Sequence, residues 1–137
     1  MKIRCMIMAL TIALTALTTS VSGQQPTVPD EILVALKGGD SKLLSKYFSS
    51  SVELVILDKE GVYSKTQAEF ILKEFFTKNI PNNYVKLHEP VNVKKDASKA
   101  VIGKLSTAKG QFRVYFLMIN VNGQFSINQL RIENDTN

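Results

Sequence analysis

The chain has 137 residues, 45% of them hydrophobic, and a formal net charge of +5. A chain of this length and composition predicts a single domain with one hydrophobic core. The basic residues are scattered and are not clustered beside base-stacking aromatics, so the sequence does not favour a nucleic-acid partner.

Residues 1–23 have the layout of a secretory signal peptide. Lys2 and Arg4 give a short positive region, and the apolar run Met6–Leu17 is too short for a membrane span. Small residues follow, so we expect cleavage near Gly23 and an exported protein, periplasmic or secreted, without a stable membrane anchor. The alternative is a retained N-terminal helix. Cleavage would lower the net charge to +3.

Cys5 is the only cysteine, and it precedes the apolar run. A lipoprotein cysteine would follow such a run, so the position of Cys5 does not suit a lipid anchor. It leaves with the signal peptide, and we therefore expect no disulfide in the mature protein.

After a polar lead at residues 24–28, the pattern predicts one domain over 29–133 and a tail over 134–137. Pro29 and two acids suit the first turn of a helix that Gly38-Gly39 ends. Asp40 suits the N-cap of a second short helix, whose apolar residues reach Phe48, and a serine loop is expected at 49–51.

A strand is predicted over Val52–Leu57, followed by a turn at Asp58–Gly61 and a short return strand at Val62-Tyr63. Ser64 and Gln67 then fit a capping box at the start of a third helix. The apolar residues of this helix recur on one face. They are Ala68, Ile71, Leu72, Phe75 and Phe76.

Four further segments, Tyr84–Lys95, Lys99–Ala108, Gln111–Val121 and Gln124–Glu133, predict a meander of β-strands. Pro90 lacks a backbone donor, so the first of these should be an edge strand.

Asn122-Gly123 favours a two-residue hairpin turn, because both central residues need a positive φ. This turn places Met118 opposite Ile127. One extra residue at Asn128-Gln129, a β-bulge, is then needed to bring Ile132 to the same face.

After the bulge, Arg113 comes opposite Glu133 as a pair of opposite charges. A turn at Lys109-Gly110 would place Gly103 opposite Phe116, and a glycine covered by an aromatic ring helps a sheet to bend. The fold class predicted is therefore α+β, with three helices on the concave face of a curved, mixed or antiparallel sheet.

The element order resembles the nuclear transport factor 2-like superfamily, a cystatin-like α+β cone. Five segments more closely resemble a small secreted bacterial family called domain of unknown function 4783. They are Val28–Ile32, Leu54–Gly61, Val62–Lys65, Phe112–Leu117 and Gln129–Glu133. That family has no assigned activity. The superfamily resemblance implies ligand sites in the cone between helices and sheet, and dimers formed through the sheet.

Superfamily enzymes place acidic groups or histidine inside the cone. The predicted concave positions of the last three strands hold no Asp, Glu or His, and Glu89 is the one exception on the strand before them. Glu89 could act as an acid or base there beside Leu105, or it could turn to solvent at a bulge. His88 is the only histidine and is predicted on the convex face with Tyr84, opposite Ser106, so no metal site or cofactor is expected.

Aromatic residues could line a small apolar pocket in the cone, although aromatics at helical spacing are usually core. They are Tyr47, Tyr63, Phe75, Phe76, Phe112 and Phe116. Such a pocket would suit a small apolar ligand.

The convex face of the Gln111–Val121 strand is unusually apolar for a surface open to water. The residues predicted at an interface there are Ile102, Arg113, Tyr115, Leu117 and Ile119. We expect a homodimer through this face or a protein partner on it; the alternative is that the chain itself covers the strand.

The function favoured by the sequence is a non-enzymatic binding or interaction module. An isomerase- or hydratase-like enzyme using Glu89 in a cone pocket is the alternative.

Overall fold

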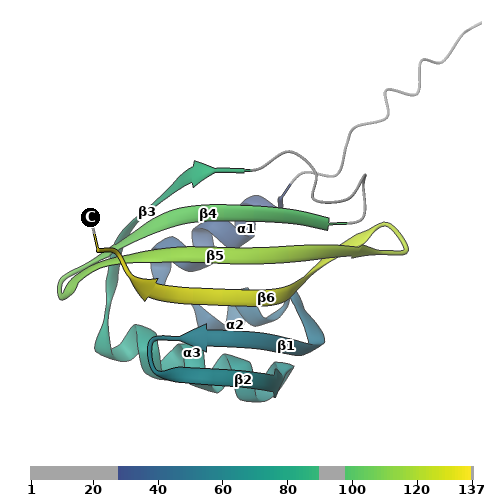
Figure 1. The fold of residues 1–137 in the computed structure, drawn as a ribbon, viewed down its shortest axis with the longest axis horizontal. Helices are drawn as coiled ribbons and strands as arrows, with labels where there is room; N and C mark the ends of the chain where they lie inside the picture. Colours follow the sequence, from purple (N-terminus) through teal and green to yellow (C-terminus); the bar gives the residue numbers. More distant parts are fainter. Residues whose placement is uncertain (1–27, 90–97, 137) are drawn as a thin grey trace, which may run out of the picture.

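The computed structural model of the protein describes residues 28–89 and 98–136. The predicted signal peptide, most of the polar lead and the segment around Pro90 lie outside the described residues. In the described part, three helices lie behind one six-stranded sheet (Figure 1). The elements are α1 (Asp30–Gly38), α2 (Ser41–Ser45), β1 (Phe48–Ile56), β2 (Lys59–Ser64), α3 (Lys65–Lys78), β3 (Pro81–His88), β4 (Ser98–Thr107), β5 (Gly110–Val121) and β6 (Gln124–Asn134).

The strand order is β2-β1-β6-β5-β4-β3. β1 runs parallel to β6, and every other neighbouring pair is antiparallel. The predicted α+β class and the mixed, curved sheet with helices on its concave face are confirmed. β3 lies at one edge of the sheet, as the sequence predicted.

The helix ends follow the local signals. Gly39 adopts a left-handed conformation, with φ +64°, after α1. The Asp40 carboxylate accepts a hydrogen bond of 2.9 Å from the Leu43 amide at the start of α2. At α3, the Ser64 hydroxyl accepts from the Gln67 amide (3.3 Å), and Gln67 Oε1 accepts from the Ser64 amide (3.1 Å). Each signal works because it satisfies backbone groups that the helix leaves unpaired.

The beginning of β1 differs from the prediction. The strand includes Phe48 and the three serines that were expected to form a loop. Phe48 pairs with Ile127 of β6, and Ser51 pairs with Ser64 of β2. The strand therefore begins earlier than predicted because Phe48 has a backbone partner on β6 and Ser51 has one on β2.

The turn between β1 and β2 is also shorter than predicted. It consists of Leu57 and Asp58, because Ile56 already pairs with Lys59. Leu57 has a φ of +52°, which a leucine seldom adopts. Its amide donates a 3.0 Å hydrogen bond to the Ile132 carbonyl of β6. Leu57 therefore combines a hydrogen bond to β6 with a left-handed backbone conformation, and its neighbours in the sequence indicate neither.

The β5–β6 hairpin is confirmed in its turn, register and bulge. Asn122 and Gly123 both have positive φ, and Val121 pairs with Gln124. Met118 pairs with Ile127, but Leu117 already pairs with Gln129, so Asn128 is the extra residue.

The β4–β5 register differs by two residues from the prediction. The turn is Ala108-Lys109, and Thr107 pairs with Gly110. The Thr107 hydroxyl accepts from the Lys109 amide at 3.1 Å and donates to the Gly110 carbonyl at 2.9 Å, which stabilises the earlier turn. A shift of two residues keeps every side chain on its predicted face.

One consequence is that Gly103 pairs with Val114, and its aromatic cover is Tyr84 of β3 rather than Phe116. Tyr84 had been predicted on the convex face. It is instead 9% exposed and belongs to the core cluster between the sheet and the helices.

Candidate functional site

The concave side of the sheet is filled by packed aromatic rings. The ring of Phe75 lies 5.6 Å from that of Phe76 and 5.1 Å from that of Phe112, both edge to face. Phe116 is completely buried. These four residues, predicted as possible pocket walls, therefore belong to the core, and the two edge-to-face contacts of Phe75 add to the stabilisation from burial.

The two tyrosines of the predicted pocket lie at the margin of this core and pack against it. The Tyr47 hydroxyl donates a hydrogen bond to the Glu31 carboxylate, which ties the end of α2 to α1 and raises the pKa of Tyr47. Tyr63 lines a shallow surface hollow beside α3.

Glu89 lies just beyond the end of β3, away from its predicted place. Leu105 pairs with Tyr84, so Glu89 is not beside it. The Glu89 carboxylate forms ion pairs with Lys99 at 2.8 Å and Lys86 at 3.0 Å. The hydrogen bond from Lys99 lowers the pKa of Glu89. A general acid at neutral pH needs the opposite shift, so these surroundings suit an ion-pairing residue at the surface.

His88 is exposed at the edge of the sheet. It pairs with Ile102 and not, as predicted, with Ser106. Within residues 28–89 and 98–136, no group of three or more His, Cys, Asp or Glu side chains could hold a metal ion. None of the helices in this part of the chain is both long enough and apolar enough to cross a membrane.

A shallow groove, which we call the α3 groove, runs between α3 and the β1–β2 hairpin. At one end it is lined by Tyr63, Gln67 and Phe70, and at the other by Leu57 and Phe75. Ile71 lines both hollows, which lie one after the other along α3.

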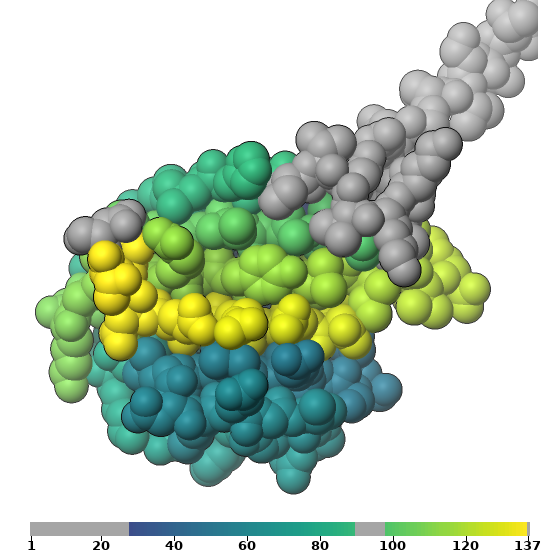
Figure 2. Space-filling view, viewed as in Figure 1, coloured from purple at the N-terminus to yellow at the C-terminus, as the bar shows by residue number. Residues whose placement is uncertain are grey.

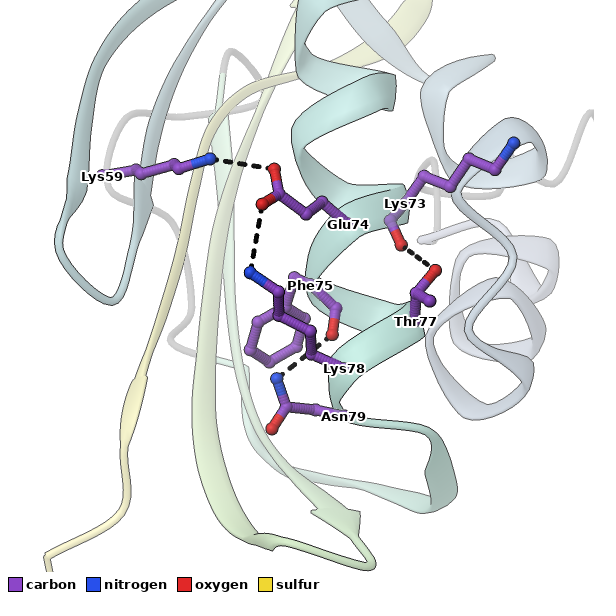
Figure 3. Close-up of polar contacts among 7 residues, drawn as sticks. All are labelled: Lys59, Lys73, Glu74, Phe75, Thr77, Lys78 and Asn79. Carbon is purple, nitrogen blue, oxygen red and sulfur yellow. Dashed lines mark hydrogen bonds and ion pairs between the residues drawn. The ribbon is translucent and has the colours of Figure 1, made fainter.

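Charged side chains bridge the α3 groove near the hairpin turn. The Glu74 carboxylate forms ion pairs with Lys59 of β2 at 2.9 Å and with Lys78 of α3 at 3.1 Å. Figure 3 shows Lys59 reaching from the hairpin to the helix, with Lys78 on the other oxygen of Glu74. The hydrogen bond from Lys59 lowers the pKa of Glu74.

The end of α3 beside this bridge is closed by its own side chains. The Asn79 side-chain amide donates to the Phe75 carbonyl at 3.1 Å, and the Thr77 hydroxyl donates to the Lys73 carbonyl at 2.7 Å (Figure 3). The Phe75 carbonyl also accepts from the Asn79 backbone amide at 2.8 Å, so Asn79 closes the last turn of α3 with both its side chain and its backbone.

The convex face of the sheet carries an apolar strip across β4 and β5. Figure 2 looks onto this face, with β6 in yellow across the middle. The pairing places Tyr115 next to Ile102 and Leu117 next to Ala100, while Ile119 continues the strip along β5. We call these five residues the convex strip.

Charged residues border the convex strip at one end. Lys104 and Arg113 are cross-strand partners, and the Asp135 carboxylate forms ion pairs with them at 3.0 and 3.2 Å. The Asp135 side chain is only 2% exposed, and its amide donates to the Gln111 carbonyl at 3.0 Å. Hydrogen bonding to Lys104 lowers the pKa of Asp135.

The register predicted for Arg113 and Glu133 is confirmed, but the ion-pair partner of Arg113 is Asp135. The two residues are opposite in the β5–β6 register, but Glu133 is bonded to Arg131 at 3.1 Å. Asp135 displaces it because the chain continues along β5 after β6 ends and brings a second carboxylate over the face.

The sequence reasoning missed Asp135, which it assigned to a tail, and Phe70, which it left unassigned. The signal for Phe70 was present, since it is an aromatic residue of α3 outside the apolar stripe. No comparable signal marked Asp135, because its burial depends on side chains of two other strands.

The family model for the domain of unknown function DUF4783 matches residues 29–133. A DUF4783 protein from Bacteroides ovatus is 36% identical, with a TM-score of 0.74 over 84% of this chain and all of that one. A second from Bacteroides uniformis is 33% identical, with a TM-score of 0.74 over 81% of this chain and all of that one.

The fold is also similar to that of an NTF2-like protein of unknown function from Shewanella baltica. That protein is 12% identical, with a TM-score of 0.57 over 79% of this chain and 88% of that one. The fold is thus NTF2-like, as the sequence resemblance implied. No curated protein matches the chain.

Proposed function

The chain belongs to the DUF4783 family, whose function is unknown. From the surface of the chain itself, we propose that it is a non-enzymatic interaction module. The module dimerises through the convex face of its sheet. The observation that carries this proposal is the convex strip. A sheet face that met only water would alternate to polar side chains, and this one presents two aliphatic residues and a tyrosine in succession on β5.

A second copy of the chain is the partner that we propose for the convex strip. An apolar strip is complementary to itself, so a two-fold axis near the strip brings like surfaces together. The charged groups beside the strip already have partners within the chain: Asp135 with Lys104 and Arg113, and Glu133 with Arg131. They would border the interface without requiring opposite charges from the second copy.

The concave side gives little support to the enzyme alternative. Its predicted pocket positions are filled by Phe75, Phe76, Phe112 and Phe116, and Glu89 is engaged by two lysines outside them. None of the buried residues in the part of the chain that the structure describes is an Asp, Glu or His, so the interaction module is the function that the geometry supports best.

We further propose that the module acts after export, with residues 1–23 removed. The support is the positive region and short apolar run before Gly23. Mass spectrometry of the protein recovered outside the cytoplasm should give a mature chain that begins near Gln24. A mature chain that begins at Met1 would refute export by cleavage.

The test of the dimer is light scattering coupled to size-exclusion chromatography of the mature chain. The expected mass is that of two chains, and Leu117→Lys should shift it to one chain because it places a charge in the strip. Val34→Lys is the matched control, since Val34 is an exposed apolar residue on α1. A wild-type monomer at high concentration, or a dimer unaffected by Leu117→Lys, would refute the proposal.

A further inference from the structure

The turn between β5 and β6 projects beyond the strands on either side of the hairpin. β4 begins at Ser98, which pairs with Ile119, so no residue of β4 lies beside the last two residues of β5. The pairing of β1 with β6 begins only at Ile127. Among the described residues, the segment 120–125 therefore pairs only across its own hairpin, and its tip extends past β4 (Figure 1).

Asn122 and Gly123 at this tip are held by few contacts. Both residues are exposed, with φ of +54° and +83°. Neither the Asn122 side-chain amide nor the Gly123 backbone amide takes part in a hydrogen bond within residues 28–89 and 98–136. A Cβ added to Gly123 would meet no atom within 4 Å. A rotation that brings the Gly123 nitrogen to the Asn122 side chain is therefore opposed only by the hairpin itself.

The chemistry open to an exposed Asn-Gly pair is cyclisation. The Gly123 nitrogen, after losing its proton to a base in solution, attacks the side-chain carbonyl carbon of Asn122. The bond between that carbon and the side-chain nitrogen breaks, ammonia leaves, and a five-membered succinimide ring is formed. Water then opens the ring at one of its two carbonyl carbons and gives aspartate or isoaspartate. The sequence of steps consumes only water.

Glycine makes this step easier than any other following residue, because it has no side chain to obstruct the ring and its main chain rotates freely. Asn122-Gly123 is the one Asn-Gly pair in the sequence. We propose that Asn122 is a site of spontaneous deamidation, at which the hairpin turn converts to aspartate or isoaspartate as the protein ages.

The two products should affect the hairpin differently. Aspartate followed by glycine supports the same two-residue turn, so this product keeps the register and adds one negative charge. Isoaspartate routes the main chain through the side-chain carbon and lengthens it by one atom. A turn of that length no longer fits the pairing of Val121 with Gln124.

The distortion should be confined to the end of the hairpin. Ile127 is held independently of the turn, because its amide donates to the Tyr47 carbonyl at 2.6 Å and it pairs with Phe48 of β1. The strand pairs that depend on the turn are therefore those from Val121–Gln124 to Ile119–Ser126.

Ile119 belongs to the convex strip, so the modification would also regulate the proposed dimer. This part of the inference rests on the proposed function. Isoaspartate at position 122 would displace Ile119, and either product would place a carboxylate beside the end of the strip. Both changes should weaken the association of two copies.

The test is a time course of the mature chain at physiological temperature, at neutral and at mildly alkaline pH, followed by tryptic digestion. One peptide, residues 114–131, carries Asn120, Asn122 and Asn128. Mass spectrometry with electron-transfer fragmentation should place both products at Asn122, with faster conversion at the higher pH. Asn120 and Asn128, which are followed by valine and glutamine, should convert at least about tenfold more slowly.

Two controls separate the structure from the sequence. Asn122→Gly keeps a turn-forming pair, cannot deamidate at this position, and should show no conversion there. A synthetic peptide of residues 114–131 gives the rate without the fold, and the folded chain should convert within about tenfold of it because the tip lacks other contacts. A slower folded chain, or equal conversion at Asn120 and Asn128, would overturn the proposal.

Light scattering of the isolated isoaspartate form tests the regulation. This form should dissociate at a higher concentration than Asn122→Gly incubated in the same way, and equal dissociation would overturn the link to the dimer. A wild-type chain that is monomeric from the start would refute the proposed dimer alone, since the deamidation is read by mass and not by oligomeric state.

Discussion

Tyr84 of β3 lies across Gly103 of β4, and its ring occupies the space that a side chain at position 103 would need. A Cβ on Gly103 would lie 2.6 Å from the Cε2 atom of Tyr84 and closer still to Cζ and the hydroxyl. The edge strand therefore closes over the sheet by placing an aromatic ring on a glycine. This arrangement buries Tyr84 in the core although neighbouring Val85 is exposed.

Gly103→Ala should destabilise the protein by about 1–3 kcal/mol, the usual cost of overpacking. The added methyl group would push the Tyr84 ring away from β4. In the background of Tyr84→Leu, which removes the ring, the same substitution should cost much less. Urea denaturation of the four proteins in this double-mutant cycle measures the coupling. Equal costs of Gly103→Ala in both backgrounds would contradict the contact.

Tyr84→Phe should stabilise the protein by about 1 kcal/mol at neutral pH, because the buried Tyr84 hydroxyl has no hydrogen-bond partner among residues 28–89 and 98–136. Burial also raises the pKa of Tyr84 well above its usual value near 10. The neutral form is thus favoured in the folded state. The wild-type protein therefore keeps its full stability below about pH 10, where Tyr84 is neutral in both the folded and the unfolded state. It loses stability as the pH rises from there towards the folded pKa.

Urea denaturation of wild type and Tyr84→Phe from pH 7 to 11 checks both statements. The difference in unfolding free energy should widen above pH of about 10, by at most about 1.4 kcal/mol per pH unit. A constant difference would indicate that Tyr84 titrates normally in the folded protein.

Asp135→Asn should lower the urea midpoint at pH 7, since it removes the charge held between Lys104 and Arg113. Those contacts lower the pKa of Asp135 in the folded state. Their stabilisation is therefore present above the unfolded pKa of about 3.9 and is lost as the pH falls through the folded value. The midpoints of wild type and variant should converge in acid.

Glu133→Gln is the control for this measurement. Glu133 carries the same charge two residues earlier, but its bond to Arg131 lies in the solvent-exposed part of the same face. Exposed pairs contribute little, so its midpoint should remain close to that of wild type. An equal loss in both variants would indicate a general effect of charge and not the Asp135 contact.

Ser64→Ala should destabilise the protein by about 1 kcal/mol, because the Ser64 hydroxyl caps the first turn of α3. Thr66→Ala in the same turn removes a hydroxyl that has no capping role and should cost nothing. Thermal unfolding followed by circular dichroism compares them. If both variants melt at the same temperature, the capping contribution is absent.

The elements that could be predicted were those with a signal in adjacent residues. Asn122-Gly123 determines its own turn, and from that turn the alternation of apolar residues required a bulge at Asn128. Gly39, Asp40 and Ser64 act on backbone groups within one helical turn. These interactions are short in sequence, so the prediction needed no knowledge of the rest of the fold.

The errors occurred where a distant strand supplied the deciding partner. The Leu57 amide is bonded to β6, which is compatible with a turn conformation unusual for leucine. The Ser51 backbone belongs to a strand because β2 lies beside it. In both cases the residue type alone favoured another local structure.

The sequence by itself determined the fold class, the β5–β6 register and which face of β5 each side chain occupies, because alternation and turn geometry are properties of neighbouring residues. Only the tertiary structure decided that Phe75 and Phe112 fill the concave side, that Tyr84 turns inward over Gly103, and that Asp135 replaces Glu133 as the partner of Arg113. It also brought β2 and α3 together beside Phe70. Those outcomes depend on packing and charge contacts between segments far apart in the chain, and no local pattern encodes which of several suitable partners will be nearest.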